Sequence, residues 1–256
     1  MTLLQVKGVT KRFGGLTAVD DVSFDLFEGT IKALIGPNGA GKTTLFNALT
    51  GFGRPDRGSV LFEGRELVGT GARVIVRSGL ARTFQNTQLF DAMTALENVM
   101  VGVMAHERAG FLSSALRLPS SLRRDKEAAG EARRLLRLIG IDEWAAAGAG
   151  DLPAGIRRLL EIARALATAP KLLLLDEPAA GLNMSETASL ADVLYRIRDQ
   201  GTTVLIVEHD MGLVMEVSDE IVVLDRGRKI AEGPPRLIQK DPAVIAAYLG
   251  EETVDV

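Results

Sequence analysis

Residues 36–44 read Gly36-Pro37-Asn38-Gly39-Ala40-Gly41-Lys42-Thr43-Thr44. They match the pattern G-x-x-x-x-G-K-[ST], in which the glycines let backbone N–H groups surround a polyphosphate. Residues 30–35 predict a buried strand before this stretch, and residues 44–49 predict a helix after it. We therefore expect a phosphate loop between a strand and a helix. Lys42 would reach the outer phosphates, and the Thr43 hydroxyl would bind the Mg²⁺ that accompanies them.

The composition of the 256-residue chain suits one large α/β domain, or one domain with an inserted lobe. Hydrophobic residues make up 46% and charged residues 25%, and the formal net charge of −3 gives no reason to expect a nucleic-acid partner. There are no cysteines, which excludes disulfides and thiolate metal sites. No apolar run approaches the roughly 18 residues that span a bilayer. We expect the chain to act at a membrane only through a partner protein.

The pattern along the chain predicts an α/β core that is interrupted by a helical block. Residues 1–90 are strand-rich and residues 151–256 alternate strands with helices, so together they are expected to form a nucleotide-binding core lobe. Residues 91–150 are rich in Ala and Arg, and we expect them to form an inserted helical subdomain. We interpret the irregular piece at residues 107–124 as a surface insertion. These are lobes of a single domain over residues 1–256 rather than independent domains.

The second motif reads Leu172-Leu173-Leu174-Leu175-Asp176-Glu177. Consecutive leucines predict a strand buried on both faces, and acids at its carboxyl end lie where open α/β sheets place their ligands. Asp176 is suited to hold Mg²⁺ through water, and Glu177 to polarise an attacking water. Another apolar strand, at residues 203–208, is followed by His209. Like Asp176, His209 stands at the end of an apolar strand, and this position favours a contact with the γ-phosphate.

Two further positions carry weaker signals. Gln85 lies where the strand-rich part meets the helical block, and a glutamine there could touch Mg²⁺ or the attacking water. Surface glutamines are common, so an ordinary surface residue is the alternative. Phe13 precedes two glycines near the first strand and could stack on adenine, although a core phenylalanine is equally consistent with the sequence.

Together these residues resemble the ATP-binding cassette (ABC) ATPases over essentially the whole chain. The motifs stand in the family's order: Phe13, the phosphate loop, Gln85, residues 152–156, Asp176-Glu177, residues 180–183 and His209. The resemblance implies a P-loop NTPase core with an N-terminal antiparallel β subdomain and an inserted α-helical subdomain. It also implies an ATPase that uses ATP and Mg²⁺. Its catalytic residues would be Glu177, His209 and Gln85, and its metal contacts Thr43, Gln85 and Asp176.

The finer resemblance is to the ATP-binding subunits of branched-chain amino acid importers. It rests on Arg82-Thr83-Phe84-Gln85, residues 111–124, 160–166 and 176–183, Glu208-His209-Asp210-Met211 and residues 241–250. It implies a motor on the cytoplasmic face of the inner membrane, partnered by permease subunits, a sister ATPase or a second copy, and indirectly a periplasmic solute-binding protein. Alternatives are the ATPase of a lipopolysaccharide-export-type transporter, and a non-transport regulatory ATP-binding module.

One segment departs from the family pattern, which is usually Leu-Ser-Gly-Gly-Gln. Here it reads Leu152-Pro153-Ala154-Gly155-Ile156, and we call it the signature segment. In the family this peptide crosses a dimer interface and caps the partner's γ-phosphate. Pro153 supplies neither a hydroxyl nor an N–H, and losing one charge-assisted hydrogen bond costs about 1.5–3 kcal/mol. Proline is favoured at the first helical position, and Gly155 keeps an N–H at the positive end of the helix dipole. We therefore expect a working but weaker cap.

Overall fold

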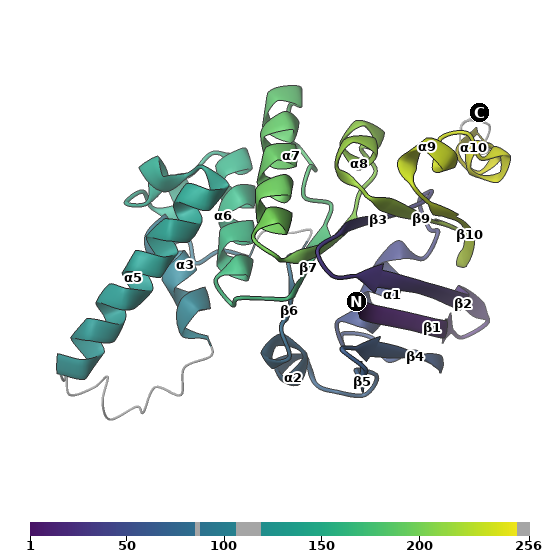
Figure 1. Ribbon diagram of the computed structural model, residues 1–256, viewed down its shortest axis with the longest axis horizontal. Coiled ribbons are helices and arrows are strands. Elements are labelled where there is room, and N and C mark those ends of the chain that lie inside the picture. Colours follow the sequence, from purple (N-terminus) through teal and green to yellow (C-terminus); the bar gives the residue numbers. More distant parts are fainter. Residues whose placement is uncertain (85–87, 106–118, 250–256) are drawn as a thin grey trace.

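The computed structural model describes residues 1–84, 88–105 and 119–249, and of residues 119–122 and 249 the backbone alone. Figure 1 shows two sheets with helices between and around them. The antiparallel sheet has the order β2-β1-β4-β5, with β1 Thr2–Phe13, β2 Leu16–Phe27, β4 Arg57–Phe62 and β5 Arg65–Glu66. The second sheet has the order β10-β9-β3-β8-β7-β6 and is parallel except for β10. Its strands are β3 Ile31–Ile35, β6 Leu80–Arg82, β7 Leu172–Asp176, β8 Thr203–Val207, β9 Glu220–Asp225 and β10 Arg228–Gly233.

The helices cover both faces of the parallel sheet. They are α1 Lys42–Leu49, α2 Ala72–Arg77, α3 Ala95–Met104, α5 Pro119–Ile139, α6 Ala154–Leu166, α7 Met184–Asp199, α8 Met211–Val217, α9 Pro235–Ile238 and α10 Pro242–Leu249, with short 3₁₀ turns at Asp142–Trp144 and Ala149–Asp151. Figure 1 shows α1 between the two sheets, and α3 and α5 farthest from the antiparallel one. No helix in the described ranges is both long and apolar enough to cross a bilayer.

Strand β7 is buried on both faces, as its run of leucines predicts. Leu173 and Leu175 belong to the apolar cluster that includes side chains of α6 and α7. Leu172 and Leu174 belong to the cluster that includes α1 and the antiparallel sheet. Successive side chains of a strand point to opposite faces, so a strand with a core on each side needs an apolar residue at every position.

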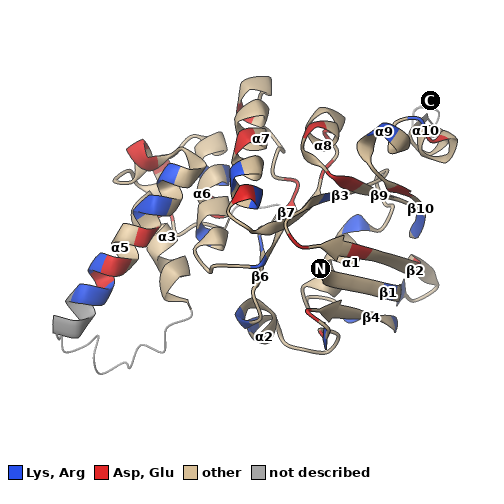
Figure 2. Ribbon diagram, in the orientation of Figure 1, with Lys and Arg blue, Asp and Glu red and all other residues tan. Residues whose placement is uncertain are grey.

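The helical part of the chain lies at one end of the molecule. Helix α3 packs against α5 and α6, and it begins with a capping box in which Thr94 and Glu97 bond to each other's backbone N–H groups. The helical spacing at residues 131–139 predicts that Leu135, Leu138 and Ile139 share one face. In α5, Leu135 and Ile139 are buried and Leu138 is half-buried. Figure 2 shows both signs of charge along the helix. Most of the predicted insertion at residues 107–124 lies outside the described residues, and the lobe boundaries near 90 and 150 stay a prediction.

Both ends of α6 and the lengths of β1 and β2 differ from the expected fold. Helix α6 begins at Ala154, with Pro153 as the N-cap at φ −54 and ψ 151 rather than as the first helical residue. Its carbonyl accepts the first helical hydrogen bond, from the Arg157 N–H at 2.9 Å. The apolar pattern predicts a helix over residues 156–169 that stops at Pro170. The helix ends earlier, at Leu166, because Ala169 adopts a left-handed φ of 46 before Pro170. The alternation at residues 3–9 and 22–26 predicts two strands there. Strands β1 and β2 are longer, since irregularities in their pairing interrupt the alternation.

Candidate functional site

The phosphate loop between β3 and α1 is shaped by glycines. At Gly36 (φ 149) a Cβ would lie 2.1 Å from the carbonyl oxygen of Leu224, and at Gly41 (φ 99) it would lie 2.3 Å from that of Ala18. Only glycine fits at these two positions. At Gly39, by contrast, a Cβ would meet nothing within 4 Å. That side of the loop is open to a ligand.

The start of α1 offers positive charge to this open side. Lys42 donates from Nζ to the carbonyl oxygens of Gly36, at 2.5 Å, and Pro37, at 2.9 Å. Thr43 follows and is exposed. The helix has no acidic residue in its first turn and no side-chain cap, so its N–H groups and the positive end of its dipole suit an anion.

A cleft of about 530 Å³ lies in front of the loop, and we call it the nucleotide cleft. Its described lining residues are Phe13, Leu16, Thr17, Ala18, Asn38, Gly39, Gly41, Lys42, Thr43, Thr44, Glu177, Arg226 and Gly227. Phe13 is 57% exposed, which argues against its alternative role as a core residue. The structure thus brings the candidate adenine-stacking residue, the phosphate loop and the candidate catalytic acid into one space. Pro37 and Ala40 also belong to the loop, but both are buried and neither is among the described residues that line the cleft.

The two acids at the end of β7 have different surroundings. Asp176 is 5% exposed, and its Oδ2 accepts a hydrogen bond from Arg82 Nη2 at 2.8 Å. Glu177 has a left-handed φ of 48, and its N–H donates to the carbonyl of Val207 at 2.9 Å. A non-glycine residue in this conformation stores backbone strain, which is characteristic of functional sites. The turn directs Glu177 into the nucleotide cleft while Asp176 stays in the sheet.

His209 lies at the same edge of the sheet, two residues after β8, with its side chain 66% exposed. It is not among the described residues that line the nucleotide cleft. Its neighbour Glu208 is buried, and no separate role was predicted for that residue. Glu208 accepts hydrogen bonds from the N–H groups of Ala179 at 2.6 Å and His209 at 3.0 Å. It therefore holds the loop after Glu177 and the loop of His209 together.

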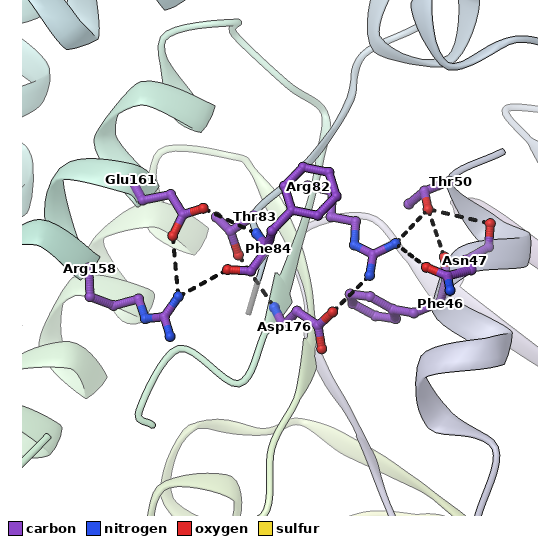
Figure 3. A network of polar contacts seen from close by, with 9 residues as sticks. All are labelled: Phe46, Asn47, Thr50, Arg82, Thr83, Phe84, Arg158, Glu161 and Asp176. Atoms are coloured by element: carbon purple, nitrogen blue, oxygen red, sulfur yellow. Dashed lines mark hydrogen bonds and ion pairs between the residues drawn. The ribbon is translucent and has the colours of Figure 1, made fainter. Parts of the chain in front are cut away.

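A polar network around residues 82–84 was also missed (Figure 3). Arg158 of α6 donates to the carbonyl of Phe84 at 3.1 Å and to Glu161 at 3.2 Å. Glu161 in turn accepts from the Phe84 N–H at 3.2 Å. Burial raises the pKa of Glu161, against the opposing effects of the Phe84 N–H and the charge of Arg158. The segment that leads to Gln85 is thereby fastened to α6. Gln85 itself lies outside the described residues.

The signature segment lies away from the nucleotide cleft of its own chain. None of its residues is among the described lining of that cleft. Leu152 and Gly155 are buried, Ile156 is half-buried, and Pro153 and Ala154 are exposed. A Cβ on Gly155 would lie 2.6 Å from Glu186 Oε1. Glu186 and Asn183 form the capping box that begins α7, so the signature segment packs directly on that cap.

The residues at the phosphate loop suit an Mg²⁺ ion that arrives with a nucleotide. Within the described ranges, no three or more His, Cys, Asp or Glu side chains gather into a metal site. Thr43 and Asp176 provide hard oxygen donors from α1 and β7. Mg²⁺ is usually held by one or two such protein groups together with phosphates and waters. The donor set therefore fits this ion.

Comparison with known proteins decides the family. The profile of the ABC transporter family matches residues 19–180. The chain belongs to the ABC transporter family. The cassette also matches, over residues 228–254, the profile described as branched-chain amino acid ATP-binding cassette transporter.

Two curated relatives match the cassette over almost its full length. One is the high-affinity branched-chain amino acid transport ATP-binding protein BraF of Pseudomonas aeruginosa, 46% identical and covering 97% of this chain and 98% of BraF. The other is the corresponding LivG protein of Escherichia coli K12, with the same identity and coverage.

Solved structures agree with the fold of the cassette. The ADP conformation of an ATP-binding cassette of an ABC transporter is 32% identical, with a TM-score of 0.85, and the match covers 98% of this chain and 99% of that one. A nucleotide-free cassette has a TM-score of 0.82 at 32% identity, covering 97% and 99%. The expected ABC ATPase fold is confirmed, and the chain is a nucleotide-binding ATPase of this type.

Proposed function

We propose that this cassette is the ATP-hydrolysing motor subunit of an importer for branched-chain or related amino acids. It would act on the cytoplasmic face of the inner membrane. The observation that carries the proposal is the 46% identity to BraF and LivG across 97% of the chain. The match at residues 228–254 adds support from the C-terminal region, which lies outside the general cassette profile.

The geometry of the nucleotide cleft supports a specific division of roles. Phe13 stacks on adenine, and the phosphate loop, with Gly36, Pro37, Asn38, Gly39, Ala40, Gly41, Lys42, Thr43 and Thr44, holds the phosphates. Glu177 orients water for attack on the γ-phosphate, and His209 stabilises the charge that develops there. Thr43 and Asp176, with Gln85, would hold Mg²⁺, which would neutralise phosphate charge when bound.

A second cassette completes each site in this proposal. The nucleotide cleft is open, and the signature segment of the same chain lies elsewhere while exposing Pro153 and Ala154. Leu152, Pro153, Ala154, Gly155 and Ile156 would therefore cover the ATP of a partner, either a sister ATPase or a second copy. Because Pro153 has no N–H, this cap is weaker than the family's usual one.

The permease is proposed to bind beside residues 82–84. A groove of about 470 Å³ there is lined in part by Val76, Phe84, Phe90, Val101 and Arg164, and we call it the permease groove. The four apolar side chains among these five residues are between 36% and 48% exposed. Contiguous exposed apolar surface of this kind is typical of a protein interface. A periplasmic solute-binding protein would act through the permease without touching the cassette, and no nucleic-acid partner is proposed.

The catalytic assignment is tested by Glu177→Gln in the transporter assembled with its permease. ATP hydrolysis, measured as phosphate release, should fall at least about 100-fold, because the amide cannot polarise water as the carboxylate does. Binding of ATP should persist, since Lys42 and the loop are intact. Glu143→Gln, at an exposed position away from the cleft, serves as the control.

Near-wild-type turnover of the Glu177→Gln transporter would refute the assignment. Uptake of labelled leucine by the same preparation tests the solute class separately. Hydrolysis stimulated by a lipopolysaccharide precursor, or a cassette that never co-purifies with a permease, would instead favour the export or regulatory alternatives.

A further inference from the structure

Arg82, the last residue of β6, is a buried cation next to the candidate Mg²⁺ ligand. Its side chain is 7% exposed. Nη2 donates to Oδ2 of Asp176 at 2.8 Å, and Nη1 donates to Asn47 Oδ1 at 2.8 Å and Thr50 Oγ1 at 2.9 Å. Figure 3 shows the guanidinium between Asp176 on one side and the α1 residues on the other. One side chain therefore connects the end of β7 with α1.

Aromatic rings enclose the same guanidinium. Its carbon lies 5.1 Å from the ring centre of Phe46, 5.2 Å from that of Phe84 and 5.8 Å from that of Phe52. Such contacts favour arginine over lysine, whose ammonium group is smaller and more strongly hydrated. Among the described residues, Asp176 is the one carboxylate that pairs with Arg82. This pairing fixes Oδ2, whereas Oδ1 of Asp176 accepts no hydrogen bond from the described part of the chain.

Arg82 contacts Asn47 within α1 and Thr50 at the C-cap of that helix, and both share a face with Thr43. Asn47 lies four residues and Thr50 seven residues after Thr43, which is the spacing of side chains stacked along one side of a helix. Arg82 thus bonds to the helix face that also presents the Thr43 hydroxyl. The same guanidinium holds the carboxylate of Asp176.

We propose that Arg82 is a positioning residue that fixes Asp176 relative to Thr43 and thereby sets the Mg²⁺ dependence of nucleotide binding. The proposal rests on the nucleotide site of the proposed function. Arg82 itself need not touch the nucleotide. It orients two oxygen donors from different elements so that both face the same cation, and it leaves one carboxylate oxygen available.

The test is equilibrium binding of a fluorescent, non-hydrolysable ATP analogue to the full chain, first in EDTA and then over a series of MgCl₂ concentrations. Arg82→Met keeps much of the side-chain volume but loses the charge and all donors. Its affinity in EDTA should stay within about twofold of wild type, because Lys42 and the loop glycines are unchanged. The MgCl₂ concentration at half-maximal effect should rise about tenfold, as expected for the loss of one charge-assisted hydrogen bond.

A second, milder variant distinguishes the proposed role of Arg82 from a folding defect of Arg82→Met. Asn47→Ala removes one anchor on α1 but leaves Arg82 paired with Asp176, and should shift the MgCl₂ midpoint in the same direction by a smaller factor. Arg198→Met is the matched control, because Arg198 also pairs with an aspartate at 2.9 Å and lies 5.1 Å from the ring centre of Tyr195, on the distant helix α7. It should leave both measurements unchanged.

Three results would overturn the proposal. An unchanged MgCl₂ midpoint in Arg82→Met and Asn47→Ala would show that Arg82 only packs. A lower midpoint would show that its charge competes with Mg²⁺ instead of placing Asp176. Equal losses of affinity with and without MgCl₂ would indicate a general structural defect. Failure of the nucleotide site itself is recognised separately, as wild-type protein that binds the analogue no better than Lys42→Ala.

Discussion

Glu161 shows how one buried carboxylate can couple stability to pH. Burial raises its pKa above the ordinary value of about 4.3, even though the Phe84 N–H and Arg158 act in the opposite direction. The folded chain therefore holds this proton more tightly than the unfolded chain. The resulting contribution to stability is complete below the ordinary pKa and is lost as pH rises through the folded-state pKa.

Glu161→Gln should remove this pH dependence. The Gln side chain cannot ionise, so it avoids the cost that wild type incurs as pH rises from the ordinary pKa of a glutamate through the raised pKa of Glu161. The melting temperature of the variant minus that of wild type should become more positive over this interval, as measured by circular dichroism. A difference that stays constant or becomes more negative would contradict the assigned direction of the pKa shift.

At the scale of whole elements, two helical glycines have opposite reasons to be there. In α3, a Cβ on Gly102 would lie 2.5 Å from the carbonyl oxygen of Arg164 and 2.7 Å from Cβ of Ala167, so α3 and α6 touch backbone to backbone. In α5, a Cβ on exposed Gly130 would meet nothing within 4 Å. The first glycine allows close helix packing, whereas the second only weakens its helix.

Alanine should therefore change stability with opposite sign at the two positions. Gly102→Ala should lower the free energy of unfolding by about 1–3 kcal/mol through overpacking against α6. Gly130→Ala should raise it by about 0.5–1 kcal/mol through helix propensity and a less flexible unfolded chain. Urea denaturation of the two variants measures both. Destabilisation by Gly130→Ala would show that α5 has a contact on that side.

The elements that build the cleft were predictable where the signal is local. Strands β3, β7 and β8 and the phosphate loop follow from buried runs ended by glycine, acid or polar residues. The apolar periodicity alone predicts the start of α6 at residue 156, two residues late, because Ala154 and Gly155 add nothing to that periodicity. The pairing of Arg82 with Asp176 joins residues 94 positions apart, so no pattern along the chain reports it. The role of Glu208 was missed because it was assigned to the strand.

At the scale of the molecule, the exposed apolar side chains have an uneven distribution. Phe84, Phe90 and Val101 gather in the permease groove, between the parallel sheet and the helical part. Phe84 also belongs to the network with Arg158 and Glu161, and Glu161 lines the same groove. A protein that binds in the groove therefore contacts Arg82 and Phe84. Arg82 bonds to Asp176, and Phe84 bonds to Arg158 of α6.

Charge placed in this groove should separate the cassette from its permease. Val101→Asp would bury an unpaired carboxylate in the interface and should reduce co-purification with the permease at least about tenfold. Val74→Asp provides a control, because Val74 is 58% exposed but is not among the described residues of the groove. Equal recovery of permease with both variants would place the docking surface elsewhere.

The distance between the signature segment and its own cleft has a consequence for inheritance. Where the partner is a second copy of this chain, one copy with a defective Lys42 and one with a defective Gly155 would still build a single intact site, since the sound loop of one copy meets the sound signature segment of the other. Two loss-of-function alleles of this kind complement each other. A copy that is damaged at both positions contributes to no intact site and acts as a dominant negative.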